Sequence, residues 1–104
     1  MRAIQYYGPQ NIKLENVMVK PPEEGEIVVK VMSALTCGTD VKTFRRGHPV
    51  LIKSIPSGFG HEFAGIVDRV GKDVTNVKVG DRVVCANSAP CGKCFYCKRE
   101  EYNL

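Results

Sequence analysis

The chain has 104 residues, of which 43% are hydrophobic and 25% are charged, and its formal net charge is +4. This length suits one ordinary domain, and this balance is typical of folded soluble proteins rather than of disordered or membrane-embedded chains. No run approaches the eighteen or so apolar residues of a membrane helix, and the N-terminus lacks the apolar segment of a signal peptide. We therefore expect a cytoplasmic protein without a membrane partner.

The positive charges are spread along the chain among acidic neighbours such as Glu23, Asp68 and Asp81. This distribution indicates a solvated surface, and we expect no nucleic-acid partner. The chain has five cysteines, an odd number that cannot all pair, and reduced thiols prevail in the cytoplasm. Metal binding or catalysis explains these thiols better than a disulfide framework.

Alternating and β-branched runs predict strands, and clusters of Gly, Pro, Asn and Asp separate them. The predicted strands cover residues 1–7, 12–19, 26–35, 62–70 and 81–86. They indicate a mostly β domain, a barrel or a sandwich.

The segment "CGTDVKTFRRG" predicts a short helix between two of these strands. Thr39 is the expected N-cap, Arg45 and Arg46 suit the negative C-terminal end, and Gly47 can end the helix.

Cys37 stands directly before this helix, and His61 stands before the strand over residues 62–70. Thiolate and imidazole both suit zinc. Each residue alone also has a simpler interpretation, a buried thiol or a hydrogen-bonded histidine. The two lie so far apart in sequence that only tertiary folding can make them share a metal ion.

Three further cysteines, Cys91, Cys94 and Cys97, are spaced three apart near the C-terminus. This regular spacing is typical of a tetrahedral zinc site, which usually takes four ligands. Unrelated thiols are the alternative. Cys85 falls outside the pattern and is expected to be a buried thiol.

Four motifs follow one another along the chain: "CGTD", "GHEFAGIVDRVG", "VGDRVV" and "CGKCFYC". In this order they resemble the N-terminal catalytic domain of the zinc-dependent medium-chain dehydrogenases. The resemblance covers nearly the whole chain. It implies a mostly β, GroES-like barrel with a short helix over residues 1–104, and a structural-zinc lobe that begins in 86–104. It also implies that NAD or NADP binds a Rossmann domain that this sequence does not contain.

The resemblance assigns roles to individual residues. Cys37 and His61 would be catalytic zinc ligands, and Glu62 an exchangeable or supporting ligand. Asp40 would hold the far nitrogen of His61, and Thr39 would pass the alcohol proton away from the metal.

The resemblance also assigns a structural zinc ion to Cys91, Cys94 and Cys97, with a fourth cysteine expected at position 105. One residue departs from the family. Lys42 stands where many relatives carry a relay histidine, and an ammonium group cannot accept a proton.

We therefore expect part of an NAD(P)-linked zinc enzyme that interconverts a small alcohol or polyol and its carbonyl compound. The full-length enzyme is expected to be a homo-oligomer, and the present chain alone is expected to be inactive. The alternatives are a zinc-ribbon binding module and a non-catalytic GroES-like assembly domain.

Overall fold

A computed structural model describes residues 1–86 and 89–102. The strands are β1 (Arg2–Gly8), β2 (Asn11–Asn16), β3 (Ile27–Leu35), β4 (Ser57–Gly58), β5 (Glu62–Val70) and β6 (Arg82–Val84). The helices are α1 (Gly38–Arg46) and the short 3₁₀ helix η1 (Cys97–Arg99). The predicted mostly β chain with one short α-helix is confirmed.

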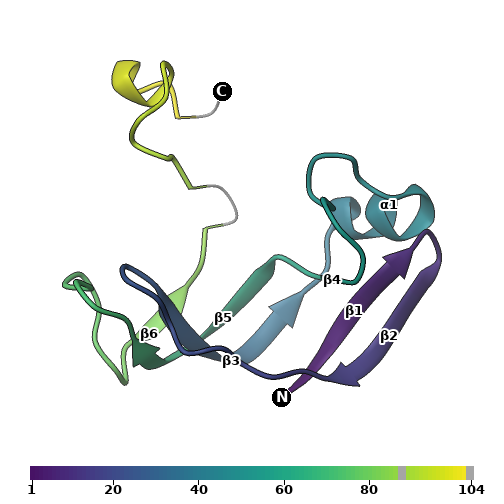
Figure 1. Ribbon diagram of the computed structural model, residues 1–104, viewed down its shortest axis with the longest axis horizontal. Coiled ribbons are helices and arrows are strands. Elements are labelled where there is room, and N and C mark those ends of the chain that lie inside the picture. Colours follow the sequence, from purple (N-terminus) through teal and green to yellow (C-terminus); the bar gives the residue numbers. More distant parts are fainter. Residues whose placement is uncertain (87–88, 103–104) are drawn as a thin grey trace.

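The strands form two antiparallel three-stranded sheets, ordered β2-β1-β4 and β3-β5-β6. Figure 1 shows the sheets side by side, with α1 near the end of β1 and the C-terminal lobe extending away from the strands. The chain crosses from one sheet to the other between β4 and β5, where Gly60 has φ 106°. This conformation is open to glycine and strained for other residues.

The five predicted strands are all present: β5 has the predicted bounds, and the other four have shifted ends. β2 is shorter than predicted because its pairing with β1 ends at Arg2↔Asn16. β4 was not predicted: it has two residues, and its serine and glycine carry no apolar signal. The lobe predicted over 86–104 is described except for residues 87–88 and 103–104.

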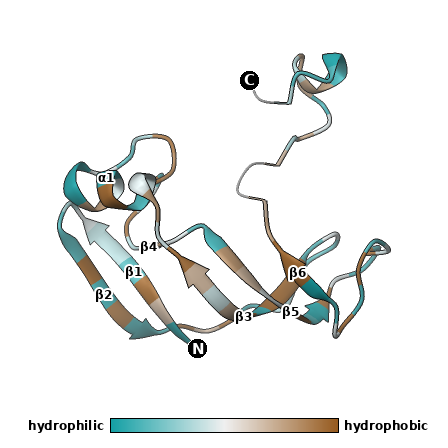
Figure 2. Cartoon of the chain, turned by 180° about the vertical axis from the view of Figure 1, so that it is seen from behind, coloured by the Kyte–Doolittle hydropathy of each residue, from teal (hydrophilic) through white to brown (hydrophobic). Residues whose placement is uncertain are grey.

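Two hydrophobic side chains are fully buried among the described residues, those of Tyr6 and Val67. The Tyr6 ring stacks on Phe59, with ring centroids 5.9 Å apart and planes 11° apart. Many other apolar side chains face solvent, including those of Leu35 and Val84, which are 71% and 79% exposed. Hydrophobic and hydrophilic residues alternate along β2 in Figure 2, and the apolar Ile12 and Leu14 of this strand are exposed as well.

Two glycines of the motif "GHEFAGIVDRVG" lie where a neighbouring main chain comes too close for a side chain. A Cβ on Gly65 would overlap the main-chain carbonyl of Lys30 on the paired strand, and a Cβ on Gly71 would overlap the carbonyl of Glu23. Both glycines therefore allow the main chain of β5 and the turn after it to pack closely against neighbouring backbone.

Helix α1 begins differently from the prediction. Cys37, not Thr39, is its N-cap: the Cys37 sulfur accepts the N–H of Thr39 at 3.3 Å. Asp40 completes a capping box, because its Oδ2 accepts the Cys37 N–H at 2.9 Å. The helix starts earlier than expected because a thiol and a carboxylate together cap it. The predicted end is confirmed, with Arg45 and Arg46 in the last turn and Gly47 as C-cap.

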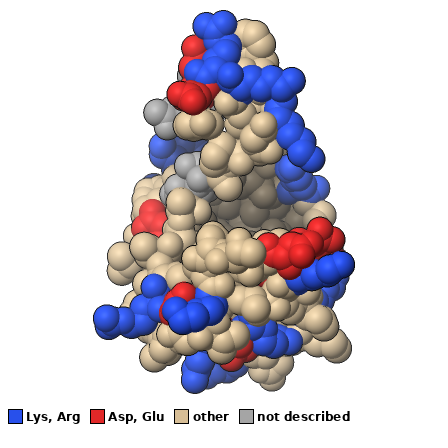
Figure 3. Space-filling model, turned by 90° about the vertical axis from the view of Figure 1, so that its left-hand side faces the viewer, with Lys and Arg blue, Asp and Glu red and all other residues tan. Residues whose placement is uncertain are grey.

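The molecule is hollowed between the C-terminal lobe and the sheets, as the side view in Figure 3 shows. Lys and Arg side chains are prominent on the lobe and are also scattered over the body of the molecule. In the described part of the chain, no helix is long and apolar enough to cross a membrane.

Candidate metal centres

The first cluster forms where β3 and β5 end side by side. The last residue pair of these antiparallel strands is Leu35↔Glu62. Cys37 lies just after the end of β3 and His61 just before the start of β5, so strand pairing brings them together. The predicted convergence of these two side chains is therefore a consequence of sheet register.

The ligand atoms of this cluster have a spacing that suits zinc. Cys37 Sγ lies 3.3 Å from His61 Nε2, and Glu62 Oε1 lies 3.6 Å from the same nitrogen. Tetrahedral zinc, with bonds of about 2.3 Å to sulfur and about 2.1 Å to nitrogen, would separate sulfur and nitrogen by about 3.6 Å. All three ligand atoms lie within 4.8 Å of one another, so these residues form a candidate metal site.

Asp40 contacts both His61 and the backbone of Cys37. Its side chain is almost buried, and its Oδ1 lies 3.1 Å from His61 Nδ1. Its other oxygen accepts the Cys37 N–H. Because Asp40 faces Nδ1, a proton on that nitrogen leaves the Nε2 lone pair directed at Cys37 and Glu62. One carboxylate thus orients the imidazole and the loop that carries the sulfur.

Thr39 and Lys42 lie on the same helix. Thr39 is half-buried, and its backbone N–H faces the Cys37 sulfur. Lys42 is exposed. Among the described residues, Lys42 makes no ion pair.

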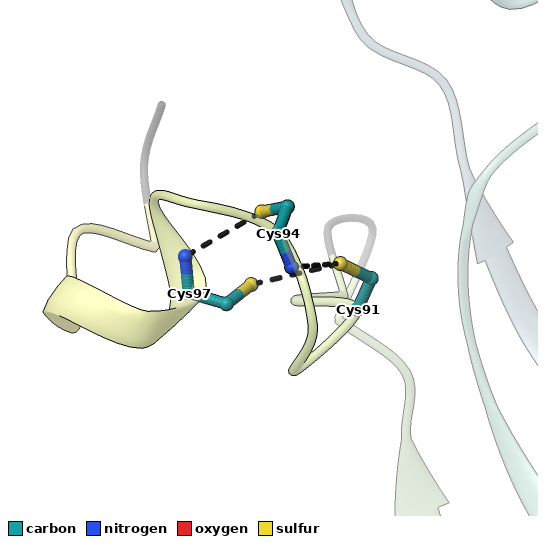
Figure 4. Close-up of side chains that lie close together, drawn as sticks. All are labelled: Cys91, Cys94 and Cys97. Carbon is teal, nitrogen blue, oxygen red and sulfur yellow. Dashed lines mark hydrogen bonds between the residues drawn. The ribbon is translucent and has the colours of Figure 1, made fainter.

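The second cluster consists of Cys91, Cys94 and Cys97 in the C-terminal lobe, and Figure 4 shows their side chains gathered around one point. The sulfurs of Cys91 and Cys97 are 3.9 Å apart. Tetrahedral zinc with bonds of about 2.3 Å to sulfur places two thiolates about 3.8 Å apart. The cluster therefore fits a structural-zinc lobe.

The electrostatics of this lobe favour one thiolate. Backbone N–H groups of Lys93 and Cys94 lower the pKa of Cys91 from its ordinary value of 9.0 to about 7. Burial raises the pKa of Cys97, and its hydrogen bond with Cys94 acts in the same direction. Metal binding requires thiolates, so Cys91 is the thiol best prepared to bind first.

Cys85 lies just after β6 and belongs to neither cluster. It is half-buried, so the expected buried thiol is only partly enclosed. It lines a cavity of about 380 Å³ together with Leu35, Glu62 and Phe63. Sequence reasoning did not predict this cavity, because residues from three strands form it.

Residues 23–104 match the alcohol dehydrogenase GroES-like domain. A medium chain reductase/dehydrogenase from Acremonium sp is 43% identical over 99 residues, which are 94% of this chain and 33% of that protein. An S-(hydroxymethyl)glutathione dehydrogenase from Aspergillus oryzae is 39% identical over 102 residues, 98% of this chain and 26% of that protein. The chain thus spans about a quarter to a third of the length of these curated relatives.

Solved structures agree. A cobalt- and zinc-bound thermostable alcohol dehydrogenase from Pyrobaculum aerophilum is 32% identical, with a TM-score of 0.87 over 100% of this chain and 32% of its own. An alcohol dehydrogenase from E. coli in complex with NADH is 34% identical, with a TM-score of 0.85 over 99% of this chain and 29% of its own. A dehydrogenase from Sinorhizobium meliloti bound to NADP is 31% identical, with a TM-score of 0.82 over 99% of this chain and 29% of its own.

The chain belongs to the zinc-containing medium-chain alcohol dehydrogenase family and carries its GroES-like domain. The predicted family and GroES-like fold are confirmed.

Proposed function

We propose that this chain is the metal-binding portion of an NAD(P)-linked zinc dehydrogenase that interconverts a small alcohol or polyol and its carbonyl compound. The observation that carries the proposal is the 3.3 Å approach of Cys37 Sγ to His61 Nε2, with Glu62 beside them. Relatives that bind zinc, NADH or NADP support the class of reaction. The nicotinamide cofactor is assigned to another part of the enzyme.

In this proposal, Cys37 and His61 hold the catalytic zinc ion and Glu62 is an exchangeable third ligand. Zinc bound there would supply a Lewis acid, which can lower the pKa of bound water to about 7 and would make a bound alcohol similarly acidic.

The remaining residues would orient this ligand pair and move the proton. Asp40 keeps Nε2 free to bind metal by holding the opposite nitrogen. The half-buried Thr39 hydroxyl would take up the alcohol proton. Lys42 cannot accept this proton while it is protonated, so the proton would leave Thr39 to water.

The three-cysteine lobe would have a structural role. Structural zinc sites contribute about 10 to 16 kcal/mol of apparent binding free energy at neutral pH, which couples metal binding to folding. A short lobe with one 3₁₀ turn and exposed side chains has little core of its own. Zinc would therefore stabilise the lobe.

The two alternative functions do not explain the first cluster. A zinc-ribbon module needs Cys91, Cys94 and Cys97 but has no use for Cys37 and His61. A non-catalytic assembly domain needs neither cluster. The capping box, the β3–β5 register and the imidazole orientation all converge on the first cluster, which favours a catalytic metal.

Metal content tests the proposal directly. With two candidate clusters, the purified protein is expected to bind about two zinc ions per chain. Cys37→Ser and Cys91→Ser should each lose about one ion, whereas Cys85→Ser, outside both clusters, should lose none. In cobalt-loaded protein, an added primary alcohol should shift the visible absorption bands in wild type and leave them unchanged in Cys37→Ser.

Equal metal content in Cys37→Ser and in the Cys85→Ser control would refute the first centre. An alcohol-dependent spectral change that survives Cys37→Ser but disappears in Cys91→Ser would place the alcohol-binding metal ion in the lobe, and the catalytic assignment would fail.

A further inference from the structure

A cavity of about 320 Å³ lies at the C-terminal end of α1, separate from both cysteine clusters. Its apolar wall consists of Pro9, Pro49, Ile52 and Ile55. Its polar side chains are those of Tyr6, Arg46 and His48. Among the residues that the structure describes, no aspartate or glutamate lines it. The cavity thus combines an apolar wall with groups that can donate hydrogen bonds.

Tyr6 supplies a buried hydroxyl that lacks a partner. The residue is 1% exposed, and its hydroxyl makes no hydrogen bond with the part of the chain that the structure describes. A Cβ on Gly47 would lie only 3.3 Å from this oxygen, so the glycine makes room beside it. Buried hydroxyl groups normally find a partner, because leaving one without a hydrogen bond costs free energy.

His48 is held as a donor. Its Nδ1 accepts the backbone N–H groups of Val50 and Leu51 at 3.4 and 3.2 Å. In the neutral ring the proton must then sit on Nε2, which leaves an N–H for a ligand. Together with the guanidinium of Arg46, the cavity offers three hydrogen-bond donors of which one is permanently charged.

The surrounding segment is strongly positive. Residues 41–60 contain Lys42, Arg45, Arg46 and Lys53 and no aspartate or glutamate. None of these four cations makes an ion pair with any residue in 1–86 or 89–102. Positive charges without internal partners attract anions from solution.

The dipole of α1 opposes this attraction, since the C-terminal end of a helix carries about half a negative charge. Two of the terminal carbonyls are already satisfied, because Thr43 O accepts the Gly47 N–H and Phe44 O accepts the Gln10 N–H. The half charge is also small beside the cations of this segment. We therefore expect a positive net potential at the cavity.

We propose that this cavity binds a small organic anion, a phosphate or carboxylate attached to an apolar group. Arg46, His48 and Tyr6 donate hydrogen bonds to the oxyanion, and the apolar group packs against the prolines and isoleucines of the wall. The site stands apart from the proposed dehydrogenase chemistry and does not depend on a bound metal.

Amide NMR titration tests the proposal with phenyl phosphate, benzoate, inorganic phosphate and neutral benzyl alcohol. Phenyl phosphate or benzoate should shift the amide signals of Gly47 and His48 and should bind more tightly than inorganic phosphate. Benzyl alcohol should leave these signals unchanged. A comparison of phenyl phosphate with benzoate identifies the preferred oxyanion.

Matched variants locate the anion. Arg46→Gln should weaken binding by roughly tenfold to a hundredfold, the range for a lost charged hydrogen bond, and Arg46→Lys should restore part of it. Arg45→Gln, which removes a neighbouring cation that does not line the cavity, should weaken binding less than about threefold because water and salt screen it. Tyr6→Phe keeps the ring and should weaken binding roughly twofold to tenfold.

Three results would overturn the proposal. Equal weakening in Arg45→Gln and Arg46→Gln would indicate diffuse attraction without a site. Equal affinity for inorganic phosphate and both organic anions would remove the role of the apolar wall. Amide shifts confined to Cys37 and His61 would place the anion at the metal cluster.

Discussion

Asp40→Asn tests the orientation of the ligands in the first metal cluster without removing any ligand. The side chain keeps its size and touches no metal, but it loses one of the two acceptor oxygens that hold His61 Nδ1 and the Cys37 N–H at 3.1 and 2.9 Å. If the amide oxygen still accepts the Cys37 N–H, its NH₂ group faces His61. This arrangement favours the imidazole tautomer with a proton on Nε2, the nitrogen that faces Cys37 and Glu62.

The expected loss can be worked from these contacts. Changing a residue that orients a metal-binding histidine typically costs 10- to 100-fold in metal affinity. At 1.36 kcal/mol per factor of ten, this is about 1.4 to 2.7 kcal/mol. One hydrogen bond to a charged group is worth about 1.5 to 3 kcal/mol, so losing a single bond of Asp40 accounts for the whole effect.

Competition with a chromophoric chelator measures the zinc affinity of each cluster. Asp40→Asn should weaken the first cluster 10- to 100-fold and leave the second unchanged. Asp68→Asn, an exposed position on β5, is the matched control and should change neither. An Asp40→Asn affinity within twofold of wild type at the first cluster would refute the proposed orienting role of Asp40.

Three further predictions concern the fold and the helix. Gly65→Ala should destabilise the chain by about 1 to 3 kcal/mol in urea unfolding, because the added Cβ meets a main-chain carbonyl of β3. The control is Gly58→Ala, whose Cβ meets nothing within 4 Å and which should change stability far less. Equal losses would contradict the steric explanation. Hydrogen bonds from the backbone and side chain of Lys78 lower the pKa of Asp81, so its stabilising contribution is complete above its ordinary pKa of 3.8 and is lost as the pH falls through the lower folded value. The urea midpoints of wild type and Asp81→Asn should therefore converge in strong acid, and a gap that widens there would contradict this sign. Lys42→Ala should leave the zinc content per chain unchanged, and a lost zinc ion would show that Lys42 supports the metal cluster.

Several features follow from the sequence because local chemistry decides them. Cys91, Cys94 and Cys97 are three residues apart, and the local turns between them bring their sulfurs close enough to gather around one ion. The strand over 62–70 follows from its alternating residues and was predicted with its observed bounds. Arg45, Arg46 and Gly47 end the helix as predicted because side-chain charge and glycine conformation act within one turn.

The start of the same helix shows where local reasoning fails. A hydroxyl at Thr39 is a common cap, but the thiol of Cys37 and the carboxylate of Asp40 cap the helix instead. Asp40 is also nearly buried against His61, which lies in a distant segment. The capping residues thus take part in a tertiary contact that helix propensities do not contain.

The family, the strand-rich character and the candidate ligands can all be read from the residues alone. The meeting of Cys37 and His61 requires the folded sheet, because the Leu35↔Glu62 register sets both side chains at the same end of a strand pair. A shift of one residue in that register would turn every side chain of β5 to the opposite face. The cavity that joins Tyr6 to Arg46 and His48 is likewise tertiary, since β1, the end of α1 and the loop after it must pack together to form it.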